Sequence, residues 1–161
     1  MEWFVKAFLK ASLASLALGV TLGLAMAAHP PLTIHRVAHM HLVLLGFVTM
    51  MIYGIGYHVV PRFAGHALHS ARAAGWHWWS STVGLAFMVV GFMLRAVLPS
   101  SGTWILVAGG SLSAIGAYLF VYVIWRTVNG SPAAQAAAAR ARESASAARR
   151  APLPHLPASA T

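Results

Sequence analysis

The sequence predicts an all-α integral membrane protein, a bundle of four transmembrane helices with both termini in the cytoplasm. Of its 161 residues, 59% are hydrophobic and 8% are charged, whereas soluble domains carry about 25% charged residues. Four apolar runs each reach the length of about 20 residues that a helix needs to cross a bilayer core. Tryptophans near the ends of these runs match an interfacial aromatic belt.

The first two runs cover about residues 4–28 and 32–60. Pro30 and Pro31 separate them, because proline interrupts a helix from within, and Pro31 suits the first turn of the second helix. For the same steric reason, Pro61 is expected to end the second helix.

The third and fourth runs cover about residues 76–98 and 102–125. The segment "PSSG", residues 99–102, is expected to form a tight turn between them. The fourth run carries a face of small residues, which suits close helix packing within the chain or against a partner. These residues are Ala108, Gly109, Gly110, Ser113, Ala114, Gly116 and Ala117.

Basic residues near the ends of the runs fall mostly on one predicted side of the membrane. They are Lys6, Lys10, Arg62, Arg72 and Arg126, with the arginines of the C-terminal tail. The positive-inside rule places this side, and both termini, in the cytoplasm. In a bacterial cell the chain would be a multi-pass protein of the inner membrane, with residues 29–41 facing the periplasm.

The first run has a second interpretation. Lys6 and Lys10, the apolar stretch and the "AMA" of residues 25–27 resemble a secretory signal peptide. Its removal would leave three helices. We favour a retained helix, because the run is long and its orientation fits the other three.

Two regions follow from composition. Residues 1–128 form the predicted transmembrane domain, and residues 129–161 form a tail rich in Ala, Arg and Pro. Such a tail has little with which to build a core, so we expect it to be disordered or partly helical in the cytoplasm. Its arginines are either solvated or in contact with anionic lipid headgroups.

Composition also excludes several kinds of chemistry. The chain has no cysteine and no aspartate, and its acids are Glu2 and Glu143. Thiolate metal sites, covalent c-type haem attachment, carboxylate pairs and a Ser-His-Asp triad are therefore absent from it. The formal net charge of +9 does not predict nucleic-acid binding, because the cations lie at the ends of apolar runs and in the tail. Membrane lipid is the expected surrounding.

Histidines in an apolar span are the candidate functional residues, because ionisable groups there are costly. His35 and His39 lie one helical turn apart, and Gly46 returns to that face seven residues after His39. Met50 and Tyr53 continue this stripe. An imidazole can bind haem iron, and a missing side chain lets a porphyrin lie against the backbone. The stripe predicts a b-type haem site with His39 as the iron ligand.

A haem-free alternative remains. His41 lies about 200° around the helix from His39, so the two cannot face the same iron. His29, His35, His39 and His41 could instead bind copper or zinc, for which the His35/His39 spacing is suitable. They could also be structural histidines bonded to backbone or water.

A second group of histidines lies toward the other membrane surface: His58, His66, His69 and His77. His39 and His58 are separated by about 28 Å along a helix, so one metal cannot bridge the two groups. This second group is expected either to face lipid headgroups with the loop that carries it or, through three of its members, to bind a metal.

Arg95 is the other costly residue, near the outer end of the third run. The sequence places no acid near it. Its guanidinium is expected either to extend to the membrane surface or to pair with a haem propionate.

The stretch from His39 to Arg62 resembles the second transmembrane helix of the heme–copper oxidase subunit I superfamily, above all the C-family cytochrome oxidases and nitric oxide reductases. In that helix a histidine near the periplasmic end ligates the low-spin b haem. A Gly-aromatic pair follows, and an exit similar to Tyr-x-Val-Val-x-Arg ends the helix. His39, Gly46-Phe47 and Tyr57 to Arg62 stand in the same order here. The resemblance implies that His39, and not His41, is the haem ligand.

The resemblance also implies limits. The family's catalytic subunit has more helices than this chain, and they carry its second low-spin haem ligand, its high-spin haem ligand and the histidines of its binuclear centre. No stand-alone oxidase activity is therefore expected. The chain would transfer electrons, sense a gas or redox state, or assist a respiratory complex. The haem-free alternative would be a copper- or zinc-binding or oxidase-assembly accessory protein.

The second axial ligand of the predicted haem is left open by the sequence. His29 or His35 could supply it if the outer loop folds inward. A partner membrane subunit could supply it instead, as could His39 of a second copy across a two-fold axis.

Overall fold

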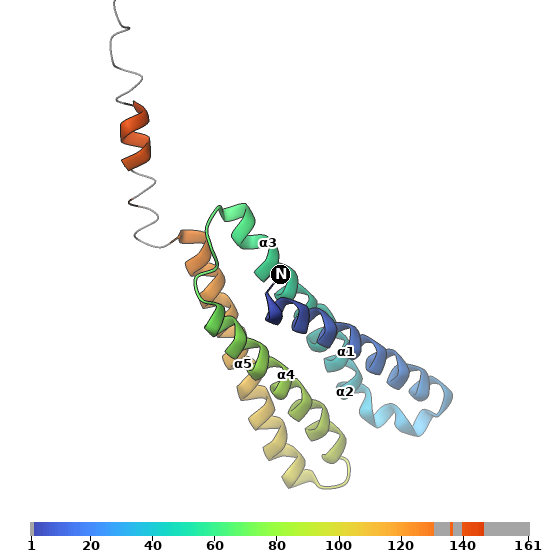
Figure 1. Ribbon diagram of the computed structural model, residues 1–161. Helices are drawn as coiled ribbons and strands as arrows, with labels where there is room; N and C mark the ends of the chain where they lie inside the picture. Colours follow the sequence, from blue (N-terminus) through green and yellow to red (C-terminus); the bar gives the residue numbers. More distant parts are fainter. Residues whose placement is uncertain (1, 131–135, 137–139, 147–161) are drawn as a thin grey trace, which may run out of the picture.

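The computed structural model describes residues 2–130, 136 and 140–146, and within these residues it contains helices and no strands (Figure 1). Four helical rods are long and apolar enough to cross a membrane: Trp3–Ala28, Pro30–Ala64, Ala71–Leu94 and Pro99–Asn129. Large apolar side chains such as Leu24, Ile115 and Val121 lie exposed on the outer faces of the rods, as lipid contact requires. The expected all-α membrane class is confirmed.

The first rod is α1, Trp3–Ala28, and the second is built from four consecutive helical segments. A 3₁₀ turn η1, Pro30–His35, leads into α2, Arg36–His41. A π-helix η2, Leu42–Thr49, follows, and α3, Met50–Ala64, completes the rod. The sequence predicted one uniform helix here, and it gave no sign of the π-helical segment.

The second rod continues past Pro61, contrary to the expectation that this proline ends it. The rod ends at Gly65, whose φ of 68° is the left-handed conformation that commonly stops a helix. Pro61 has no N–H to donate to the carbonyl of Tyr57, but the helix continues for one more turn, and the backbone nitrogen of Gly65 donates to the carbonyl oxygen of Pro61.

The third rod, α4, Ala71–Leu94, begins and ends earlier than expected. Ser70 caps it by accepting a hydrogen bond from the backbone nitrogen of Ala73, at 3.2 Å. The turn between the third and fourth rods consequently falls at residues 95–97 and not at 99–102. Pro99 begins α5, Pro99–Asn129, because a proline at the first helical position needs no backbone donor.

Helices α4 and α5 form a tightly packed antiparallel pair (Figure 1). Glycines at heptad spacing line the contact, Gly84 and Gly91 on α4 and Gly102, Gly109 and Gly116 on α5. A Cβ atom on Gly109 would lie 2.7 Å from the carbonyl oxygen of Gly84. Gly109 and Gly116 of the small-residue face therefore serve packing within the chain.

The remaining rods form a second pair, in which α1 lies against η2 and α3. The two pairs meet through α1, α3, α4 and α5 in the half of the bundle that holds the N-terminus, and through α2 and α4 in the other half. In the half that holds the N-terminus, the core consists of Phe4, Val5, Phe8, Met50, Tyr57, Ala74, Leu85 and Val123. We call this half the basic end, because it carries Lys6, Arg62, Arg72 and Arg126, and the other half the histidine end.

Helix α5 ends at Asn129, and the division of the chain at residue 128 stays a prediction. Of residues 129–161, the structure describes Asn129, Gly130, Ala136 and residues 140–146, and residues 140–146 are helical. The predicted disorder of the rest lies outside the described residues.

Candidate functional site

His39 lies in α2 with its ring against α1. Its Nδ1 is 2.9 Å from the carbonyl oxygen of Gly19, and this bond is made by Nδ1–H, because a carbonyl can only accept. In a neutral ring the other nitrogen, Nε2, then carries a free lone pair. An imidazole whose Nδ1–H donates to a backbone carbonyl is the arrangement that orients metal-binding histidines.

Small residues of α1 let the His39 ring approach that closely. A Cβ on Gly23 would lie 2.9 Å from Cε1 of His39, and a Cβ on Gly19 would lie 2.8 Å from Cγ2 of Val43. A side chain at Gly23 would therefore displace the His39 ring, and one at Gly19 would displace Val43. The two glycines set the position of the His39 ring.

The stripe that begins at His39 does share one face, which is the face that packs against α1. Gly46 is buried, and a Cβ on it would lie 2.6 Å from Cβ of Ser15 and 2.9 Å from Cδ2 of Leu85. Farther along, the ring of Tyr53 contacts that of Phe8, with centroids 5.8 Å apart. The missing side chain of Gly46 makes room for α1 in this arrangement, and no porphyrin-sized space lies over it.

The fit of a haem at this place therefore divides into two parts. The iron ligand fits, because a backbone carbonyl orients the His39 ring and the lone pair of Nε2 is free. The expected clearance over Gly46 does not, because Ser15 and Leu85 occupy it. The two cavities of about 430 and 360 Å³ in this half of the bundle are lined by other residues than His39.

The π-helix η2 lies directly after His41 and includes Gly46. The hydroxyl of Thr49 donates to the carbonyl oxygen of Leu44, five residues earlier, at 2.9 Å. A π-helix is rare and widens the helix locally, and such segments are frequent at functional sites. Its position next to the histidine group supports a functional assignment to this part of the rod.

His41 points to another face than His39, as the sequence predicted. Its Nδ1 donates to the carbonyl oxygen of Val37, at 2.9 Å, and its ring lies 4.7 Å from that of Phe92 on α4, centroid to centroid. It lines the cavity of about 430 Å³, together with Met88 and Ser113.

The other two histidines of this end do not join them. His29 follows the end of α1 and is exposed, and Nδ1 of His35 is buried without a hydrogen-bond partner. Within the described part of the chain, no three residues among His, Cys, Asp and Glu are grouped so that they could hold a metal ion. A copper or zinc site built from His29, His35, His39 and His41 therefore finds no support in this fold.

Arg95 is exposed at the turn between α4 and α5. Its backbone lies against Gly102, where a Cβ would come within 2.7 Å of the Arg95 Cα atom. This position lets the guanidinium extend toward the membrane surface. The guanidinium of Arg95 makes no hydrogen bond or ion pair with another described residue.

At the basic end, His77 is not a surface residue as expected but is fully buried in the core. The hydroxyl of Tyr57 is 2.8 Å from its Nδ1, and its Nε2 has no partner among the described residues. The ring contacts those of Phe8, Tyr53 and Phe120, with centroids 4.8, 4.4 and 5.6 Å away. His77 is buried because α4 begins at Ala71, which puts it almost two turns inside the helix.

The other histidines of the basic end are dispersed. His58 accepts a hydrogen bond from the guanidinium of Arg62, one turn away on the same helix. Nε2 of His69 lies 3.4 Å from the hydroxyl of Tyr122, and His66 lies against Gly130. None of these three contacts His77, so the metal-site alternative for this group finds no support either.

Two curated proteins are similar to this chain. The Cbb3-type cytochrome c oxidase subunit CcoN1 of Stutzerimonas stutzeri is 28% identical over 124 residues, an alignment that covers 62% of this chain and 26% of that protein. The putative cytochrome c oxidase subunit 1-beta of Streptomyces coelicolor is 32% identical over 120 residues, covering 62% of this chain and 21% of that protein. The chain thus spans about a quarter of the length of these relatives.

No family model matches the chain, and no solved structure matches it. The two alignments relate it to subunit I of the cytochrome c oxidases without assigning it to one family within that superfamily. Together with the four rods that are long and apolar enough to cross a membrane, they indicate a membrane protein.

Proposed function

We propose that this chain is a subunit-I-like protein of the bacterial inner membrane that holds a b-type haem at His39. Its role would be to transfer electrons, to sense a gas or redox state, or to assist a respiratory complex. The similarity to two cytochrome oxidase subunits supports the redox class. A complete oxidase is not proposed, because the chain spans about a quarter of those subunits.

The observation that carries the proposal is the hydrogen bond between Nδ1 of His39 and the carbonyl oxygen of Gly19. This hydrogen bond fixes the orientation of the ring and leaves the lone pair of Nε2 free to bind iron in an apolar environment. When bound, a haem would supply one-electron chemistry at its iron. The chain itself would supply the donor, its orientation and a surrounding of low polarity, which are the protein's means of setting an iron potential.

Helix α1 packs closely against η2, so the rest of the proposed haem site has to be supplied from outside this chain. Ser15 fills the space over Gly46, so this chain alone does not enclose a porphyrin on that face. His39 is half-buried near the end of its rod. We therefore place the second ligand and part of the haem enclosure on a partner, either a second copy of the chain or another membrane subunit.

The proposed orientation, with both termini in the cytoplasm, rests on the distribution of charge. The N-terminus and the C-terminal end of α5 lie at the same end of the bundle as Lys6, Arg62, Arg72 and Arg126 (Figure 1). The positive-inside rule then assigns this end to the cytoplasm. The His39 end would face the periplasm.

The proposal is tested on protein purified from haem-replete cells. We expect a Soret band and, after reduction with dithionite, the α-band of a b-type haem, with close to one haem per chain or per dimer. A colourless preparation that also fails to take up added hemin would refute the proposal.

A further inference from the structure

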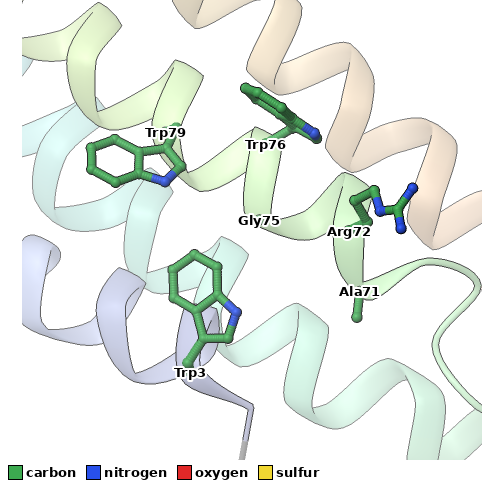
Figure 2. A pocket seen from close by; sticks show the side chains of 6 residues that line it. All are labelled: Trp3, Ala71, Arg72, Gly75, Trp76 and Trp79. Atoms are coloured by element: carbon green, nitrogen blue, oxygen red, sulfur yellow. The ribbon is translucent and has the colours of Figure 1, made fainter.

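A cavity of about 650 Å³ lies at the basic end, far from His39, between the start of α1 and the first turns of α4 (Figure 2). Trp3 of α1 lines one side of it. Ala71, Arg72, Gly75, Trp76 and Trp79 of α4 line the other. None of these residues belongs to the proposed haem site.

Gly75 has no side chain and lets the ring of Trp3 lie against α4 beside the cavity. A Cβ on Gly75 would lie 3.1 Å from Cζ2 of Trp3, so the Trp3 ring would have to shift to accommodate any larger residue there. The Trp3 ring is held in place by edge contacts with Phe4 and Trp78, with centroids 5.9 and 5.8 Å apart. These contacts hold the Trp3 ring in place as the wall of the cavity that faces Gly75.

The lining has the chemistry of a membrane–water boundary. Trp3, Trp76 and Trp79 are 53, 66 and 54% exposed, and their indoles combine an apolar surface with a single N–H donor. Arg72 is exposed, and its guanidinium makes no ion pair or hydrogen bond with another described residue. The acid nearest in sequence to Trp3 is Glu2, which forms no ion pair with Arg72.

The depth of the cavity matches one kind of occupant. Ala71 is the first residue of α4, and Trp79 lies about 12 Å farther along the helix axis. The cavity thus extends from the charged end of the span into its apolar part. An amphipathic molecule with an anionic head and an apolar tail suits this gradient, the head near Arg72 and the tail along Gly75 and Trp79.

We propose that this cavity is a binding site for the headgroup region of an anionic phospholipid, with Arg72 as the phosphate partner and the three tryptophans as its walls. The site is separate from the haem function and would fasten α1 to α4 at the basic end. Charge complementarity selects the anionic lipid, because the described lining offers one cation and no acid.

The test is native mass spectrometry of the purified chain in mild detergent with equal amounts of phosphatidylglycerol and phosphatidylcholine. We expect one tightly held lipid per chain, with phosphatidylglycerol preferred about fivefold, since one arginine near the surface favours an anionic lipid by that factor. Arg72→Gln should reduce the preference to about one. Arg126→Gln removes a cation at the same end but outside the cavity, and should leave the preference unchanged.

Two further measurements guard against a misfolded variant and a different ligand. On the unaltered protein, raising the salt from about 0.1 M to about 1 M should abolish the preference, because the screening length falls from about 10 Å to about 3 Å. Inorganic phosphate at millimolar concentration should not displace the lipid. Equal binding of both lipids by the unaltered protein, an unchanged preference in Arg72→Gln, or an equal loss in Arg126→Gln would each overturn the proposal.

Discussion

At the scale of single residues, His39 could be identified from sequence and its surroundings could not. Its spacing to Gly46 and its place before the Tyr57 to Arg62 segment single it out from the neighbouring histidines. The partner of its Nδ1, the carbonyl of Gly19, lies on another helix, twenty residues earlier. Every residue type has a backbone carbonyl, so the sequence cannot show which carbonyl of a neighbouring helix accepts this hydrogen bond. Only the structure reveals it.

A substitution at Gly46 tests whether this face of the second rod packs against α1. Gly46→Ala would bring a methyl group within 2.6 Å of Cβ of Ser15, and we expect it to lower the free energy of unfolding by about 1–3 kcal/mol. Ser15→Gly removes the nearest of the obstructing atoms, although Leu85 remains, and should recover part of this loss in the double variant. Thermal unfolding in detergent measures both. Unchanged stability in Gly46→Ala would contradict the observed contact between α1 and η2.

The buried pair of Tyr57 and His77 was missed at the sequence level, because the interfacial interpretation of His77 depended on where α4 begins. Tyr57→Phe removes the partner of a buried ring nitrogen and should cost about 1–2 kcal/mol of stability. Tyr122→Phe, at the exposed 3.4 Å contact with His69, is the matched control and should cost close to nothing. Equal effects of the two substitutions on thermal unfolding would contradict the account of His77 as a core residue.

At the scale of elements, the apolar runs located all four rods, and the local chemistry of their ends decided the differences. Ser70 was available as a capping residue, and its hydrogen bond to Ala73 explains the early start of α4. Gly65 and Pro99 mark the other shifted boundaries. The π-helix η2 could not be predicted, because its backbone pattern depends on the packing of α1 and α4 around it.

Gly109 and Gly110 are adjacent in α5 but differ in their surroundings. Alanine substitutions at the two positions therefore distinguish the effect of helix packing on stability from the effect of helix propensity. A Cβ on Gly109 would lie 2.7 Å from backbone atoms of α4, whereas one on Gly110 meets nothing within 4 Å. Gly109→Ala should therefore force α4 and α5 apart and destabilise the bundle by at least about 2 kcal/mol. Gly110→Ala should be neutral or stabilise it by up to about 1 kcal/mol. The ranking is checked by thermal unfolding, and its reversal would contradict the observed helix register.

At the scale of the whole molecule, α1 is an integral part of the bundle. Phe4, Val5 and Phe8 are among its most deeply buried side chains, and Gly19 and Gly23 position the His39 ring. A cleaved signal peptide would take this packing with it. The number of spans could be predicted from the lengths of the apolar runs alone. The central position of α1 could not, because it depends on contacts between helices.

Retention of α1 is directly measurable. We expect the intact mass of the purified chain to include residues 3–28, and N-terminal sequencing to find no new start near Ala27 or Ala28. Phe8→Ala should destabilise the bundle by about 3–5 kcal/mol, because it empties a fully buried site between α1, α3 and α4. A mature protein that starts at residue 28 or later would contradict the described fold.

The central claim, that His39 is the haem ligand of this protein, is tested most directly by reduced-minus-oxidised spectra of His39→Ala and His41→Ala, recorded beside the unaltered protein. Both variants remove one half-buried imidazole from the same end of the same rod, and their helix content can be matched by circular dichroism. We predict that the α-band disappears in His39→Ala and persists in His41→Ala. A band that survives the loss of His39, or that is lost only with His41, would contradict the account.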